Sequence, residues 1–327
     1  MVFLFRDKSI VNIFFLAVLS IAVHLHFFAE TPLIVVNKDD GFFSDLLIRY
    51  VKGQPDTLLF LLYHCLILIQ AIRLNMALND LRMFQQNTYT AAMAYILLSG
   101  MLVQWCSISS SLISNFMVIW IFIRLSKLYN HPSPKTLLFN TGLIVGASVL
   151  CYHPTAILIG VVLFALAVVR PFRLAEWLIL LMGILLPFYF LFSWLFLNDQ
   201  LGRVRVFLPS IEVDLPVKHW NLPLVIGLSV LLLNLLVGFY YWQQSINRMV
   251  IQIRKTWSVM LVMLLILLAI PFIFRHTGIE SGVMCLVPLA SYASIAFSAP
   301  RRLIVPNLLF WLAAAVIVYN NWLLFKN

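Results

Sequence analysis

The sequence predicts an all-α protein: a polytopic transmembrane helical bundle that forms a single integral-membrane domain over residues 1–327. Hydrophobic residues make up 63% of the chain and charged residues only 10%, which is outside the usual composition of a soluble domain. Apolar runs of about 18 residues or more recur along the chain, and each is long enough to cross a hydrocarbon core about 30 Å thick. The runs are continuous and do not alternate with polar residues, which argues against the strands of a β-barrel.

Polar or proline-marked breaks divide the chain into about eleven expected spans. We expect the first run to remain as a helix, because it is longer than the apolar part of a signal peptide and no small-residue cleavage site follows it. The expected spans are 10–29, 57–72, 88–106, 111–126, 136–152, 154–169, 174–197, 221–242, 257–274, 282–299 and 303–324.

The basic residues predict the orientation of these spans. When the N-terminus is placed in the cytoplasm, most of the 22 lysines and arginines lie on the cytoplasmic side and most of the 12 acidic residues lie outside, as the positive-inside rule requires. The sequence thus predicts a multi-pass protein of the cytoplasmic (inner) membrane with an external C-terminus. The net charge of +10 reports this topology and does not suggest a nucleic-acid partner, which would need a clustered basic face.

The first external loop, residues 30–56, contains the pair Asp39-Asp40. Apolar residues at helical spacing follow over 42–50 and predict a short amphipathic helix at the membrane interface. Asp45 and Arg49 are four residues apart on its other face and can pair. Either aspartate of the pair could cap this helix. The spacing leaves two alternatives open, because the acids either only cap and solubilise the loop or supply a general base to an outer cavity.

Two later external segments offer cations. The second external loop, residues 198–220, contains Arg203 and Arg205, whose forked guanidinium groups suit a phosphate. Arg275 and His276 follow a helix end directly and could meet a lipid phosphate. The alternatives are loop charges paired with neighbouring acids for the first pair and an interfacial anchor for the second.

A tight external turn, "CYHP", places Tyr152 and His153 at the same level, either as site residues or as plain interfacial anchors. No metal-ligand spacing such as H-x-x-x-H occurs, and no nucleotide-binding loop is present. The sequence therefore predicts no specific cofactor or metal. If the reaction needs a divalent cation, Asp39 and Asp40 are the residues that would hold it.

Four features in order resemble a known family. Asp39-Asp40 follows the first helix. "GLIVGASVLCYHPTAILIGVVLFAL" has a tight turn at 153–156, "LLMGILLPFYFLFSWLF" is rich in aromatic residues, and Arg275 precedes "LVPLASYASIAF". Over about residues 1–300, this layout is similar to that of the GT-C superfamily of integral-membrane glycosyltransferases. The chain would be either a bacterial branch of that superfamily or a member that has lost catalysis.

The resemblance implies a function and roles for the residues. The enzyme would move one sugar from a polyprenyl-phosphate donor to an acceptor hydroxyl on the outer face of the membrane. Asp39 would be the base and Asp40 would orient the acceptor or a cation. The phosphate and substrate would be held by Arg275, His276, Arg203, Arg205, His153 and Tyr152. The partners would be the polyprenyl-phosphate-linked sugar and the lipid bilayer, and the acceptor stays unnamed.

Two other classes of function fit the same sequence. A non-catalytic subunit or scaffold of a cell-envelope complex would use the aromatic residues for helix packing and would bind other membrane proteins. A transporter or lipid flippase is the third class. It is disfavoured because no Asp, Glu, Lys or Arg lies near the middle of an expected span, whereas transport pathways commonly contain such a residue.

Overall fold

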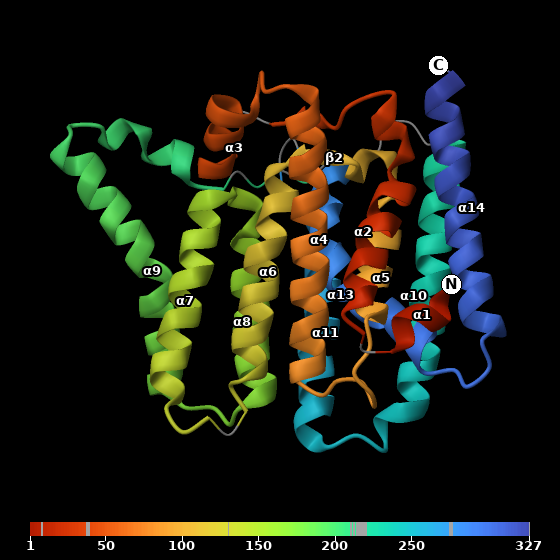
Figure 1. The fold of residues 1–327 in the computed structure, drawn as a ribbon. Coiled ribbons are helices and arrows are strands. Elements are labelled where there is room, and N and C mark those ends of the chain that lie inside the picture. The colour runs from red at the N-terminus through yellow and green to blue at the C-terminus, as the bar shows by residue number, and fades with distance from the viewer. Residues whose placement is uncertain are drawn as a thin grey trace.

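A computed structural model describes residues 1–7, 9–36, 40–129, 131–209, 211, 213, 221–274 and 277–326, and for Arg205 and 321–326 it describes the backbone alone. The described chain is a bundle of roughly antiparallel helices with short connections (Figure 1). The α-helices are α1 (Val2–Arg6), α2 (Val11–Val23), α3 (Phe42–Leu46), α4 (Asp56–Asp80), α5 (Thr90–Ser99), α6 (Ser110–Ser126), α7 (Pro134–Cys151), α8 (Ile157–Val169), α9 (Leu174–Leu197), α10 (Leu222–Ile246), α11 (Ile251–Leu267), α12 (Ile270–Ile273), α13 (Leu286–Ser298) and α14 (Ile304–Lys326).

Short elements of tighter or wider helix connect several of these. The connecting elements are η1 (Leu25–Phe28), η2 (Leu47–Val51), η3 (Val103–Trp105), η4 (His153–Ala156), η5 (Leu201–Phe207) and η6 (Ile279–Cys285). Two of them extend a long helix, because η4 leads into α8 and η6 leads into α13.

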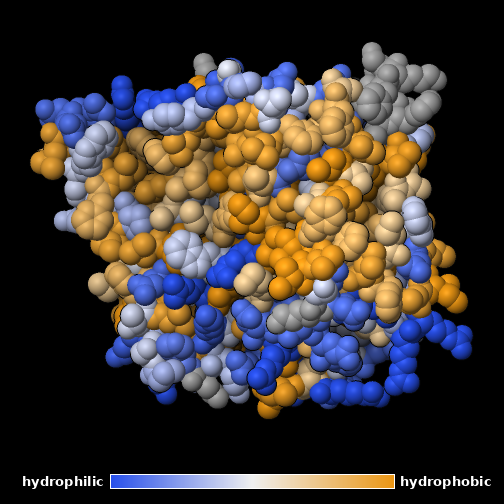
Figure 2. Space-filling view, in the orientation of Figure 1, coloured by the Kyte–Doolittle hydropathy of each residue, from blue (hydrophilic) through white to orange (hydrophobic). Residues whose placement is uncertain are grey.

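The prediction of an apolar helical bundle is confirmed, and each of the eleven expected ranges contains an α-helix. Within the described residues, six helical stretches are long and apolar enough to cross a membrane: 56–80, 134–151, 174–197, 222–246, 251–273 and 279–298. A broad hydrophobic band covers the middle of the face in Figure 2, and hydrophilic residues gather above and below it. The fold is therefore a helical bundle compatible with a multi-pass membrane protein.

Several helices differ in length from the expected spans, and α4 and α5 show the reasons. α4 continues to Asp80, eight residues beyond the expected end at 72, because its polar last turns are hydrogen-bonded to the following loop. The side-chain amides of Asn75 and Asn79 both donate to the backbone oxygen of Thr88, at 2.8 and 2.9 Å. α5 is shorter than expected and ends at Ser99, with Gly100 as its C-cap.

One small sheet lies outside the apolar runs, so the all-α expectation holds for the bundle but not for its connections. β1 (Leu33–Val35) pairs in parallel with β2 (Ser107–Ser109), in the register Leu33 with Ser107 and Val35 with Ser109. The sheet holds the first long loop beside the start of α6 at the upper end of the bundle in Figure 1.

α7 and α9 pack closely through glycines. A Cβ on Gly142 would clash with the backbone oxygen of Leu180, and one on Gly146 would clash with the backbone oxygen of Ile184. Small residues spaced four apart let helix backbones approach in this way. Above this contact α9 leans away from the rest of the bundle (Figure 1).

α13 is the central helix, and polar side chains fix the helices around it. The amide of Asn115 on α6 donates to the hydroxyl of Tyr95 on α5 and to the backbone oxygen of Val283, both at 3.1 Å. The Tyr95 hydroxyl donates to the side-chain oxygen of Gln70 on α4 at 2.7 Å. All three side chains are fully buried. Buried polar groups of this kind are costly unless they are paired, so the network specifies how four elements meet.

The start of α9 contains a buried ion pair. Glu176 is 3% exposed and accepts two hydrogen bonds from Arg170, at 2.9 and 3.1 Å. An acid at the end of a membrane-spanning helix can ordinarily extend into solvent. The structure instead neutralises it with a forked guanidinium, which is the geometry that makes such pairs strong.

Candidate functional site

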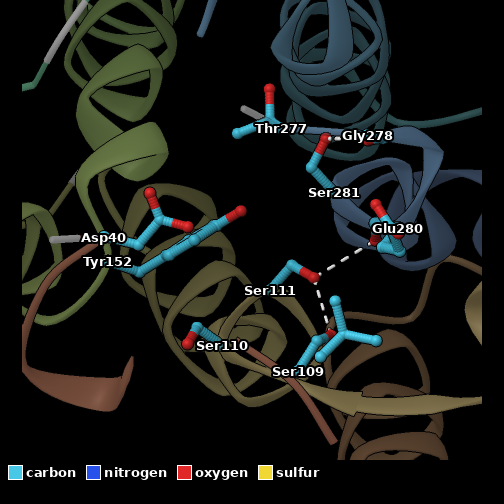
Figure 3. Close-up of a pocket in the computed structure, with 10 residues that line it drawn as sticks. Asp40, Ser109, Ser110, Ser111, Tyr152, Thr277, Gly278, Glu280 and Ser281 are labelled. Carbon is cyan, nitrogen blue, oxygen red and sulfur yellow. Dashed lines mark hydrogen bonds between the residues drawn. The ribbon is translucent and has the colours of Figure 1, made fainter. Parts of the chain in front are cut away.

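A polar pocket lies at the upper end of the bundle, where segments far apart in the sequence converge (Figure 3). The first long loop contributes Asp40, and the turn after α7 contributes Tyr152. The segment before α13 faces them from the other side. The lining residues are Val35, Asp40, Ser109, Ser110, Ser111, Tyr152, Thr277, Gly278, Glu280 and Ser281.

Backbone hydrogen bonds hold Asp40 in this place. The N–H of His153 donates to the backbone oxygen of Asp40 at 2.9 Å, which ties the loop to the tight turn after α7. The β1–β2 pairing fixes the same loop on its other side, with Val35 opposite Ser109. The position of Asp40 is therefore set by main-chain contacts on both sides.

Gly41 lets the first long loop lie close to the backbone at the end of α7. Its φ of 116° is a conformation that residues with a Cβ rarely adopt. A Cβ at this position would also lie 2.8 Å from the backbone oxygen of Cys151 and 2.9 Å from that of Leu150. The glycine therefore allows the loop to lie directly on the end of α7.

The pocket combines carboxylates with hydroxyl groups. Asp40 and Glu280 are its carboxylates, and no lysine or arginine lines it among the described residues. The Ser111 hydroxyl donates to the backbone oxygen of Glu280 at 3.1 Å and lies 2.8 Å from the Ser109 hydroxyl. These bonds join the start of α6 to the segment before α13 across the pocket floor (Figure 3).

The surroundings of Tyr152 raise the pKa of its phenol. The residue is 4% exposed. Burial raises the pKa of its phenol well above the usual value, and the negative charges of Asp40 and Glu280 raise the pKa further, whereas a hydrogen bond with Ser111 lowers it in part. The phenol therefore stays protonated and offers a neutral hydrogen-bonding group beside the two carboxylates.

The enclosed space of the pocket is small. It has room for about 20 Å³, which suits one water molecule or one hydroxyl group. A bulky substrate would therefore lie at the mouth and insert a single group.

An apolar groove of about 400 Å³ lies on the other side of the segment before α13. Ile279 and Gly282 face the groove, whereas Gly278, Glu280 and Ser281 face the polar pocket. α10, α12 and Trp105 form the opposite walls. The Trp105 ring N–H donates to the backbone oxygen of Ile279 at 2.9 Å. One helical turn thus separates a polar pocket from an apolar groove.

Several sequence-predicted site residues can now be placed. Asp40 and Tyr152 line the same pocket. His153 is buried in the turn and contacts the loop through its backbone, and its side chain is not part of the described lining.

The remaining expected site residues are not seen at this pocket. Arg203 is exposed on η5, where its guanidinium lies 3.5 Å from the side-chain oxygen of Gln200, and it does not line the pocket. Asp39, Arg275, His276 and the side chain of Arg205 lie outside the described residues.

Two features of the first loop differ from the expectations. The helix there begins after Gly41, which is its N-cap and makes no side-chain cap bond, because the loop needs the glycine conformation at that position. Asp39, one of the two expected caps, lies outside the described residues. Asp45 and Arg49 are both exposed and form no ion pair. The helix itself forms, as α3 followed by the wider turn η2.

Sequence reasoning missed two groups of residues. Glu280 was not singled out as a candidate, although it lies five residues after Arg275 in a loop already marked as a candidate. The serine run Ser109–Ser111 was not singled out. Three consecutive hydroxyls in so apolar a chain are the signal that would have found it.

Metal-binding clusters are also absent from the described ranges, since no three His, Cys, Asp or Glu side chains there come together in a way that could hold a metal ion. Comparison with known proteins assigns no family to the chain. No protein-family model matches it, and no curated protein matches it. What the fold defines is a class, an apolar helical bundle compatible with a multi-pass membrane protein, with a small polar pocket at one end.

Proposed function

We propose that the protein is a membrane glycosyltransferase that moves a sugar from a polyprenyl-phosphate donor to an acceptor hydroxyl. The observation that carries the proposal is the position of Asp40, in a hydroxyl-lined pocket one helical turn away from an apolar groove. A lipid-linked polar substrate needs such an arrangement, because its head and its chain require opposite environments.

The pocket suits the acceptor half of the reaction. An acceptor hydroxyl that enters the space beside Asp40 would transfer its proton to the carboxylate as its oxygen bonds to the anomeric carbon of the sugar. The bond from that carbon to the phosphate oxygen breaks, and the polyprenyl phosphate leaves without needing a proton. Asp39, the neighbouring carboxylate, is the alternative base. Tyr152 and Ser111 would orient the acceptor by hydrogen bonds.

The groove suits the donor chain. Its walls come from leucines of α10, from α12 and from η6, and its volume of about 400 Å³ accommodates a few isoprene units. The donor phosphate would then lie near the end of the segment that contains Arg275 and His276. Thr277, which follows them directly, lines the pocket, and cationic donors at this point would stabilise the leaving phosphate.

The membrane arrangement in this proposal has about eleven spans in a GT-C-like order, with the pocket end external and the N-terminus cytoplasmic. The positive-inside distribution supports it. So does the position of the pocket at one end of the bundle, where the hydrophobic band gives way to hydrophilic residues (Figure 2). The cytoplasmic membrane of a bacterium is the site this implies.

The test is transfer by the purified full-length protein, with a panel of short-chain polyprenyl-phosphate hexoses and with acceptors supplied by membranes of cells that lack the gene. Release of free polyprenyl phosphate measures turnover whatever the acceptor is. Loss of a general base lowers turnover by about 100-fold or more. We expect that loss in Asp40→Asn or in Asp39→Asn, depending on which carboxylate is the base.

Asp45→Asn is the matched control, since Asp45 lies on the same loop but is exposed and outside the pocket lining. It should keep turnover within twofold of the unmodified protein. Full activity in both Asp39→Asn and Asp40→Asn would overturn the transferase proposal. Wild-type protein that releases nothing but co-purifies with a stable membrane partner would favour the scaffold instead.

A further inference from the structure

A second cavity lies at the lower end of the bundle. Its volume is about 250 Å³, and it is enclosed by α1, the loop between α4 and α5, and the ends of α10 and α13. α13 connects the two ends of the molecule, because Ser281 before it lines the first pocket and Ser298 at its end lines the second. At about 1.5 Å per residue, the two cavities are about 25 Å apart.

The lower cavity is basic. Arg6 and Arg301 line it, and among the described residues no acidic side chain is part of its lining. Side chains that can form further hydrogen bonds surround them, namely Gln85, Gln86, Thr88 and Ser298. Two guanidinium groups in one cavity repel each other unless an anion lies between them.

One nitrogen of the Arg6 guanidinium lacks a hydrogen-bond partner within the described part of this cavity. Its Nε donates to the backbone oxygen of Phe297 at 2.9 Å, whereas its Nη2 is buried and has no hydrogen-bond partner among the described residues. Burial lowers the pKa of Arg6, and the adjacent Asp7 is exposed and forms no ion pair with it. An unsatisfied buried N–H on a charged group is costly, so an acceptor oxygen supplied by a ligand would stabilise the protein.

We propose that the lower cavity binds a phosphate group, with Arg6 and Arg301 as its counter-ions. The planar fork of a guanidinium matches two phosphate oxygens, and Gln85 and Gln86 can donate to the others. The volume suits a small phosphate ester, because sites for larger organic ligands occupy about 300–1,000 Å³. The ligand is either the headgroup of an anionic phospholipid or a soluble phosphate ester.

This site is independent of the proposed transfer reaction, because no residue of the lower cavity lines the upper pocket. Substitutions here leave Asp40 and its neighbours in place. The two proposals can therefore fail separately.

The experiment measures the melting temperature of the full-length protein in neutral detergent during titration with three probes: phosphatidylglycerol, phosphatidylcholine and glycerol 3-phosphate. We expect saturable stabilisation by one anionic probe. Arg301→Gln removes a charged partner without disturbing the core, since Arg301 is exposed, and should raise the apparent Kd by about tenfold. Arg302→Gln is the matched control, because Arg302 is also exposed but does not line the cavity.

Arg6→Lys is the second variant, since it keeps the charge and loses the fork, and it should weaken binding by less than Arg301→Gln. Saturation with phosphatidylglycerol alone identifies the lipid headgroup, and saturation with glycerol 3-phosphate identifies a soluble ester. Stabilisation that is equal for phosphatidylglycerol and phosphatidylcholine and unchanged by Arg301→Gln would overturn the proposal. Equal loss in Arg301→Gln and Arg302→Gln would also overturn it, because it would reflect surface charge alone.

Discussion

α13 and α9 are both apolar helices, but their surroundings differ. In the stretch Ile279–Ser298, 94% of the most apolar window is buried inside the protein, whereas for α9 the share is 22%. α9 leans away from the bundle in Figure 1, and Phe190, Trp194 and Leu197 are exposed on it. The difference teaches that hydropathy is high for both kinds of helix, although one is covered by protein and the other is largely exposed, as a helix that faces lipid would be. Both cavities lie at the ends of the covered one.

The largest expected effect comes from a matched pair of phenylalanines. Phe297 on α13 is 0% exposed and Phe190 on α9 is 63% exposed. Phe297→Ala should lower the free energy of unfolding by about 4 kcal/mol, because it leaves a cavity, whereas Phe190→Ala should change it by less than about 1 kcal/mol. Unfolding in mixed micelles measures both, and equal losses would mean that α9 is packed as tightly as α13.

The ion pair at the start of α9 comes next. Glu176→Gln leaves Arg170 buried with a neutral partner, and removal of one member of a buried pair costs about 3 kcal/mol. Since α9 has little other burial, we expect the loss to appear as a lower unfolding temperature. The exposed Arg173 also lies near Glu176, at 3.9 Å, so Arg173→Gln is the control. A loss as large in that variant would assign the effect to surface charge.

Disruption of the polar network beside α13 should lower the free energy of unfolding by less than loss of the ion pair does. Asn115→Leu removes two buried hydrogen bonds, to the Tyr95 hydroxyl and to the backbone oxygen of Val283, and should cost about 2 kcal/mol. Asn198→Leu at the end of α9 removes one exposed bond to Trp194 and should cost less than about 0.5 kcal/mol. Unfolding by denaturant compares the two, and similar midpoints would contradict the role given to the network.

The smallest effect concerns the pocket floor. Ser111→Ala removes the hydrogen bond to the backbone oxygen of Glu280, worth about 1 kcal/mol. Ser229→Ala is the control, since that exposed hydroxyl only bonds its own helix at Val225. Hydrogen exchange at residues 279–285 should accelerate in the first variant alone. Unchanged exchange there would show that other contacts hold the segment.

Helices were predictable from this sequence because each needs only a local apolar run, so every expected span contains one. Their ends were less predictable. The sequence predicted a loop for the last turns of α4 because Asn75 and Asn79 are polar. These turns are helical because both side chains donate hydrogen bonds to the backbone oxygen of Thr88, which lies in the following loop.

The site was predictable in part. Asp40 was found because it lies beside the first apolar run, and Tyr152 was found through its turn. Their meeting with Glu280 depends on contacts between residues more than 100 positions apart, which no periodicity encodes. The cap at Gly41 was missed for a related reason, since its cause is the backbone of Cys151.

The pocket also has a consequence for biosynthesis. It takes Val35 and Asp40 from the start of the chain and Thr277 to Ser281 from near its end. A ribosome must therefore translate most of the message before the two halves can meet. A nascent chain that stops short of residue 277 would contain most of the helices yet lack one wall of the pocket, so premature termination leaves the pocket incomplete.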